Sequence, residues 1–132
     1  MKKIIATFAL ATVIVSCGSQ PTANSKTSQE SLLGTQWSLS ENVKGKNPTL
    51  KIEEGRVSGN AGCNSYFGTF SGDMVTGNFS VKEVGSTKMM CENMSTETNF
   101  LNALNEANSY TVKGNTLELY KGKLLLLKFN RQ

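Results

Sequence analysis

The sequence predicts a mainly β domain with one helix: a curved antiparallel sheet, or half-barrel, with the helix packed across it. Three observations predict this class. Short segments alternate apolar and polar residues, as strands with one buried face do. Turns containing Gly or Asn separate several of them closely enough for antiparallel hairpins, and one stretch alone has helical periodicity. Residues 31–132 are enough to form one small domain.

Five short segments in the first part of this domain alternate apolar and polar residues or are rich in aromatic residues. These predicted strands are 37–39, 50–52, 56–59, 66–70 and 79–84. We expect Trp37 to be a core anchor, with a role as a ligand platform as the alternative. Tyr66, Phe67 and Phe70 are expected to fill the interface between sheet and helix.

One helix is predicted over about Ser95–Asn108. Ser95 or Thr96 can cap its start, and Glu97 suits the positive end of the helix dipole. The opposite face is polar. The apolar residues recur at helical spacing and share one face: Phe100, Leu101, Leu104 and Ala107.

Three strands are predicted at the C-terminus, over 110–112, 117–120 and 124–129. The two turns between them contain Gly114 with Asn115, and Gly122, which accept a positive φ at low cost. Because Leu124–Leu127 is apolar on both faces, we expect it to be a central strand that is covered on each side.

The N-terminus is typical of an exported protein. A positive head, Met1–Lys3, precedes the uncharged run Ile4–Val15, which is too short for a transmembrane helix. Residues 1–16 therefore predict a secretory signal peptide. The run Ile14–Cys17 resembles the bacterial lipobox, which implies that Cys17 is acylated and anchors the protein to membrane lipid. The alternative is an ordinary secreted protein whose cysteine lies near the cleavage point.

Residues 17–30 are predicted to form the lipidated cysteine and a flexible tether, because they contain few charges and little apolar side chain to bury. The expected location is the bacterial cell envelope. Gly18 follows the cysteine where an Asp would, in enteric bacteria, suggest retention in the inner membrane. The outer membrane is therefore favoured.

The composition argues against several functions. There is no His and Asp73 is the only Asp, which removes Ser-His-Asp and Cys-His nucleophiles, imidazole metal sites and EF-hand loops. The chain has 14 Lys and Arg against 10 Asp and Glu, and Lys2 and Lys3 leave with the signal peptide. No basic stripe indicates nucleic-acid binding. We expect no catalytic residues, no cofactor and no metal.

Cys63 and Cys91 remain when Cys17 is set aside. Two cysteines in an exported domain normally pair, so a disulfide is expected. The alternative is two buried free thiols that act as small apolar groups.

Four segments around these cysteines resemble the META domain, or HslJ-like, family. Gly59–Gly68 looks like its G-x-x-G-C-N-x-[FY]-x-G segment, Ser86–Cys91 matches T-x-M-x-C, Gly34–Leu39 matches G-x-x-W-x-L, and Glu97 corresponds to a family glutamate. Met90 departs mildly, since many members have Ala there. The matching motif residues are Trp37, Gly62, Cys63, Asn64, Phe67, Gly68, Thr87, Met89 and Cys91.

The resemblance implies a curved half-barrel with one helix, often on a bacterial lipoprotein. It also implies an envelope role linked to heat stress and to resistance against hydrophobic antibiotics, and it supplies no catalytic residues. Gly62 and Asn64 suit a sharp turn, with contact between Asn64 and a polar ligand as the alternative. If Met89 and Met90 lie in a strand, one is core and the other is exposed or lines a groove.

Three functions compete. The first is a non-catalytic interaction module that binds or stabilises an unidentified envelope protein under stress. The second is a half-barrel like that of secretin pilot proteins, which binds a lipid or another apolar small ligand between helix and sheet. The third is an enzyme, which would need paired Glu carboxylates or a free Cys63 thiol in a cleft. The candidate partner or ligand surface consists of Met89, Met90, Phe100 and Leu104.

Overall fold

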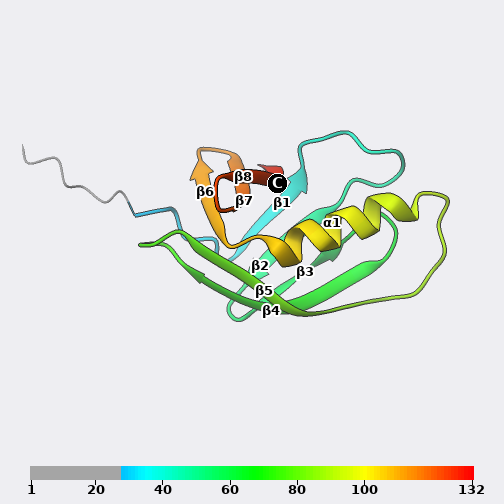
Figure 1. The fold of residues 1–132 in the computed structure, drawn as a ribbon, viewed down its shortest axis with the longest axis horizontal. Coiled ribbons are helices and arrows are strands. Elements are labelled where there is room, and N and C mark those ends of the chain that lie inside the picture. The colour runs from blue at the N-terminus through cyan, green and yellow to red at the C-terminus, as the bar shows by residue number, and fades with distance from the viewer. Residues whose placement is uncertain (1–27) are drawn as a thin grey trace, which may run out of the picture.

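The computed structural model describes residues 28–132, which form eight strands and one helix (Figure 1). The predicted signal peptide, Cys17 and most of the predicted tether lie outside these residues. In chain order the elements are β1 (Thr35–Leu39), β2 (Thr49–Glu53), β3 (Arg56–Asn60), β4 (Ser65–Asp73), β5 (Asn78–Ser86), α1 (Met94–Glu106), β6 (Ser109–Lys113), β7 (Thr116–Lys121) and β8 (Leu124–Arg131). The predicted class, mainly β with one helix, is confirmed.

The sheet is a closed antiparallel barrel, so the half-barrel expectation was too open. Each strand pairs with the next, and β8 returns to pair with β1 through Trp37 opposite Arg131 and Leu39 opposite Phe129. The Arg131 guanidinium also lies over the Trp37 ring, 4.6 Å from its centroid. This closure joins the two ends of the domain, and alternation within a single strand carries no information about such a distant pairing.

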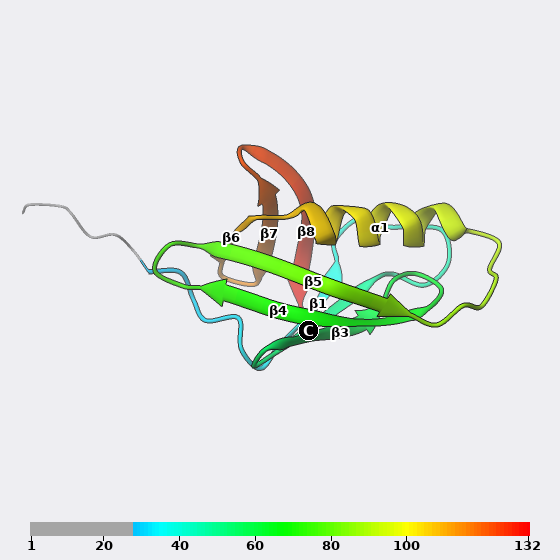
Figure 2. The same ribbon diagram turned by 60° about the horizontal axis from the view of Figure 1, so that its bottom comes forward.

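The weakest seam of the barrel lies between β5 and β6. A single residue pair, Asn78 with Ser109, joins these strands, and two flanking backbone hydrogen bonds extend the contact. The helix α1 connects the two strands in sequence and lies beside β5, where it also contacts β8 (Figure 2). The helix α1 has 13 residues and is too short to cross a bilayer. Residues 28–132 contain no helix that is long and apolar enough to do so.

The helix buries its apolar stripe in the barrel, as predicted. Phe100 packs edge-on against Tyr66 and Phe129, with centroids 5.6 and 6.2 Å apart, and Leu104 is fully buried. The N-cap, however, is Asn93, so the expected cap at Ser95 or Thr96 was wrong. The other fully buried large side chains are Trp37, Leu50, Ile52, Val57, Phe79, Val81, Leu117 and Leu119.

Two predicted core assignments were wrong. Phe67 lies on the outer face, over Gly85 of β5 and beneath Arg56, because β4 alternates regularly and buries Tyr66 and Phe70 on its other face. In β8 a bulge opposite Leu119 and Tyr120 turns Leu125 outward, and Leu124 is exposed beside the hairpin turn, although Leu127 is buried.

Gln29 and Glu30, which the sequence assigned to the tether, contact the barrel. The Gln29 backbone N–H donates to the Met74 carbonyl at 2.6 Å, and the Glu30 carboxylate pairs with Arg131 at 2.7 Å. The chain therefore reaches the barrel beside the turn between β4 and β5.

Replacing Gly59 with Ala is expected to destabilise the barrel by roughly 1–3 kcal/mol. A Cβ atom on Gly59 would overlap the backbone carbonyl of Thr49, which also accepts the Tyr66 hydroxyl hydrogen bond at 2.8 Å. Backbone atoms cannot rotate away as a side chain can. Urea unfolding of Gly59→Ala measures the loss, with the neighbouring Ser58→Ala as the matched control. Equal midpoints for the two variants would contradict the expected overlap.

Candidate functional site

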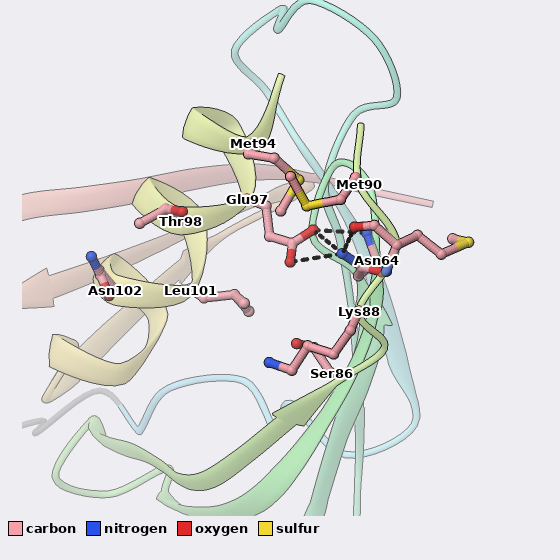
Figure 3. Close-up of a pocket in the computed structure, with 10 residues that line it drawn as sticks. Asn64, Ser86, Lys88, Met90, Met94, Glu97, Thr98, Leu101 and Asn102 are labelled. Atoms are coloured by element: carbon pink, nitrogen blue, oxygen red, sulfur yellow. Dashed lines mark hydrogen bonds between the residues drawn. The ribbon is translucent and has the colours of Figure 1, made fainter. Parts of the chain in front are cut away.

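The family motif converges on one hydrogen-bonded cluster around Asn64. This side chain is buried where the turn before β4, the segment 87–93 and α1 meet. Its Oδ1 accepts the Thr87 hydroxyl and the Met89 backbone N–H, each at 2.7 Å. Its Nδ2 donates to the Met89 carbonyl and to both Glu97 oxygens, each at 3.0 Å (Figure 3). Asn64 therefore uses its full hydrogen-bonding capacity to join three parts of the chain.

Glu97 is a buried carboxylate that amide groups hold in place. It accepts the Asn64 backbone N–H at 2.8 Å in addition to the Asn64 side chain. Among residues 28–132, no Lys or Arg forms an ion pair with it. The sequence pattern predicted that Glu97 lies at the positive end of the helix dipole and did not reveal this inward contact, although its match to a family glutamate was a signal.

The turn before Asn64 is locked by a disulfide and by a second asparagine. The predicted bridge between Cys63 and Cys91 is present, with Cα atoms 6.0 Å apart. The Asn60 side chain accepts the Gly62 N–H at 2.9 Å and donates to the Cys63 carbonyl at 3.2 Å. Gly62 has a φ of +111°, which favours glycine, and a Cβ at this position would lie 3.0 Å from the Thr96 side chain of α1. The structural interpretation of Gly62, Cys63 and Asn64 therefore has direct support.

The other motif residues build the barrel away from this cluster. Trp37 is a core anchor, as expected, and its Nε1–H donates to the Thr35 hydroxyl at 2.7 Å. Gly68 lies opposite a bulge of β5, where a Cβ would approach the Lys82 carbonyl to 3.0 Å. Phe67 covers Gly85 from outside. These three residues shape the sheet and do not reach the cluster.

An open cavity of about 380 Å³ adjoins the cluster, between α1 and the segment 87–93. Its lining mixes apolar and polar groups. Figure 3 shows Met90 extending from the segment and Met94 from α1 on one side of Glu97, with Lys88 and Leu101 also bordering the space. The remaining lining residues are Asn64, Ser86, Met89, Thr98 and Asn102.

The candidate partner surface divides into two sets. Met89 and Met90 are exposed, by 59% and 86%, whereas Phe100 and Leu104 are buried in the core. The expectation that one of the two methionines is core was wrong, because the segment 87–93 is not a strand and has no alternating faces. Phe100 packs against its aromatic neighbours Tyr66 and Phe129 beneath the helix. Along another side of α1 an open cavity of about 390 Å³ is lined by residues that include Leu39, Phe100 and Leu126, so the interface of helix and sheet is not completely filled.

Tyr66 and the two cysteines near the cluster make structural contacts. Burial raises the pKa of Tyr66 well above its usual range, so its phenol stays neutral and donates to the Thr49 carbonyl. Cys63 and Cys91 are joined and offer no free thiol. Within residues 28–132, no group of three or more His, Cys, Asp or Glu side chains is placed to hold a metal ion.

The fold and this cluster together define a single-helix antiparallel β-barrel whose motif residues hold the helix to the sheet. The chain belongs to the META domain family, whose model matches residues 30–132. No curated protein matches the sequence closely enough to count as a relative.

Two solved structures share the fold at low sequence identity. A protein from Burkholderia xenovorans, solved by NMR, is 21% identical with a TM-score of 0.64, covering 100% of this chain and 99% of its own. A crystal structure of a DUF4847 family protein from Bacteroides vulgatus is 18% identical with a TM-score of 0.55, covering 75% of this chain and 93% of its own. At such identities the likeness extends to the fold alone.

Proposed function

We propose that this META protein is a lipid-anchored, non-catalytic interaction module of the bacterial cell envelope. Acylated Cys17 holds it to membrane lipid, on the outer membrane, and the barrel binds and stabilises an envelope protein under stress. The binding site is the surface made by Met89 and Met90 with the adjoining cavity beside Met94 and Leu101. This surface is termed the methionine surface below.

The observation that carries the proposal is the exposure of two adjacent methionines next to an open cavity. Met90 is 86% exposed and Met89 is 59% exposed, and the cavity holds about 380 Å³. Methionine side chains are flexible and polarizable, and proteins use them on surfaces that adapt to apolar partners. A cavity of this size accepts one or two apolar side chains of a partner, with Lys88 at its border for a polar contact.

The backbone beneath the methionine surface is held on both sides. Asn64 binds both the N–H and the carbonyl of Met89, and the disulfide holds Cys91 two residues further on. A segment without regular secondary structure is thereby kept in one place, so little ordering is needed when a partner binds. This explains why the buried Asn64 cluster lies next to the exposed pair Met89 and Met90.

The proposal is tested by photo-crosslinking in intact cells that make the full chain. We expect a photoreactive phenylalanine analogue in place of Met90 to give one discrete protein adduct, whereas the same group in place of Asn115, an exposed turn residue, does not. With the identified partner purified, Met89→Ser with Met90→Ser is expected to raise Kd by roughly tenfold or more, as loss of apolar anchors does.

Three outcomes would count against this function. Equal adducts at positions 90 and 115 would show that the methionine surface has no preference. An unchanged Kd in the double variant would place binding elsewhere on the barrel. A phospholipid or fatty acid adduct at position 90, with no protein adduct, would favour the amphiphile-binding alternative and move its site from the helix–sheet interface to the surface cavity.

A further inference from the structure

We propose that the turn between β4 and β5 is a second membrane contact, which docks on the phospholipid surface to which the chain is anchored. The contact consists of Leu33, Met74 and Val75, termed the tip patch. This inference rests on the proposed acylation of Cys17, and it adds a binding surface at the opposite end of the barrel from the methionine surface.

The tip patch is apolar at a place where turns are normally polar. Met74 and Val75 are adjacent turn residues and are 47% and 57% exposed. Leu33 is also exposed and lines the same shallow depression as Met74. Gly, Asn, Asp and Ser dominate turns because they suit the backbone there, and two large apolar side chains have no such role.

Several backbone groups of the turn have hydrogen-bond partners within the protein. The Asp73 carboxylate accepts the N–H groups of Val75 and Thr76 at 2.7 and 2.9 Å. The Asp73 carbonyl accepts the Gly77 N–H at 2.8 Å, and the Met74 carbonyl accepts the Gln29 N–H at 2.6 Å. These N–H and carbonyl groups therefore have partners within the protein, which lowers the cost of placing this part of the turn at a lipid interface.

The described part of the chain begins beside the tip patch. Gln29 is hydrogen-bonded to Met74, so the chain joins the barrel at this turn (Figures 1 and 2). The residues between Cys17 and Gln29 span at most about 40 Å when extended. An anchor within this reach holds the tip patch at a high effective concentration near the bilayer, so a weak apolar contact suffices for docking.

Two charged residues near the turn affect the proposed membrane contact: Asp73 limits its depth and Lys123 supports it. Asp73 is exposed, so the tip patch is expected to stay at the level of the lipid head groups. Lys123 borders a surface depression shared with Thr76 and Gly77, where it can meet a lipid phosphate. Docking through this end points the segment 87–93, at the far end in Figures 1 and 2, away from the membrane.

The experiment follows oxidation of two native methionines in the full lipidated chain. The protein is purified from the envelope, its intact mass is measured, and it is placed in vesicles of phosphatidylethanolamine and phosphatidylglycerol. Chloramine-T, a charged oxidant that stays outside the bilayer, converts accessible thioethers to sulfoxides. Peptide mass spectrometry then compares the oxidation rates of Met74 and Met90, so that Met90 is an internal control.

We expect Met74 on vesicles to oxidise at least about fivefold more slowly than Met90. Without docking, their exposed fractions of 47% and 86% predict a difference of only roughly twofold. Val75→Asp is expected to return the ratio to roughly twofold, because a charge opposes docking. The matched control, Asn115→Asp, places the same charge in another turn and leaves Met74 protected.

Each outcome decides the proposal. An acylated chain whose rate ratio is the same with and without Val75→Asp overturns the membrane contact and leaves the anchor intact. An intact mass that lacks acyl chains overturns the anchor and the membrane contact together. Equal thermal midpoints of the variants and the parent exclude misfolding as the cause of any change, since position 75 is an exposed turn residue.

Discussion

Removing the bridge with Cys63→Ala and Cys91→Ala is expected to lower the midpoint of thermal unfolding by roughly 15–25 °C. The two cysteines are 28 residues apart in sequence. In the chain-entropy treatment, a loop of this length restricts the unfolded chain by about 3–4 kcal/mol. That is a large part of the stability of a domain of this size. Calorimetry of the oxidised parent and of the double variant measures the difference.

Reduction of the parent protein is the matched control for the cysteine variants. Dithiothreitol should lower the midpoint of the parent by a similar amount and leave the double variant unchanged. A difference of only a few degrees between parent and variant would mean that the Asn64 cluster alone holds the segment 87–93 against the barrel.

Local pattern was enough to predict the elements. The helix predicted over about Ser95–Asn108 occupies Met94–Glu106, because its apolar stripe and polar face are both encoded within a few turns. Glycine-containing turns likewise predicted the hairpins of β6, β7 and β8. Closure of the barrel was not predictable, since the pairing of Trp37 with Arg131 depends on residues at opposite ends of the domain.

Irregular backbone explains two of the wrong placements. Met89 and Met90 were treated as strand neighbours, yet the segment 87–93 runs from β5 to α1 without regular structure. A bulge in β8, where it pairs with β7, turns Leu125 outward. A single inserted residue reverses which side chains face inward, and no composition signal marks it.

The sequence was enough to predict which residues belong to the candidate site, but not how their side chains meet in space. Motif matching selected Asn64, Thr87, Met89 and Glu97 in order along the chain. Their joint hydrogen bonding spans 33 residues, from the turn before β4 to the helix. The contact depends on the folded path of β4 and β5 between them, so sequence spacing alone could not show that one asparagine joins all three partners.

Asn64→Ala is expected to destabilise the domain by about 3 kcal/mol. The substitution leaves the buried Glu97 carboxylate with only the backbone N–H of residue 64 as its partner. It also removes both bonds to the Met89 backbone and the acceptor of the Thr87 hydroxyl. Buried charged and polar groups that lose their partners carry the full cost of desolvation. Urea unfolding measures the loss.

Two further variants and a measurement of amide exchange test whether the loss of stability in Asn64→Ala comes from the hydrogen bonds of the Asn64 cluster. Asn99→Ala, on the exposed face of the same helix, should change stability by less than about 0.5 kcal/mol. Glu97→Gln should cost less than Asn64→Ala, because the neutral amide still accepts a hydrogen bond from Asn64 and requires less solvation. Amide exchange at Met89 should accelerate in Asn64→Ala, since its N–H loses its acceptor. Unchanged exchange at Met89 would show that the disulfide, not Asn64, orders the methionine surface.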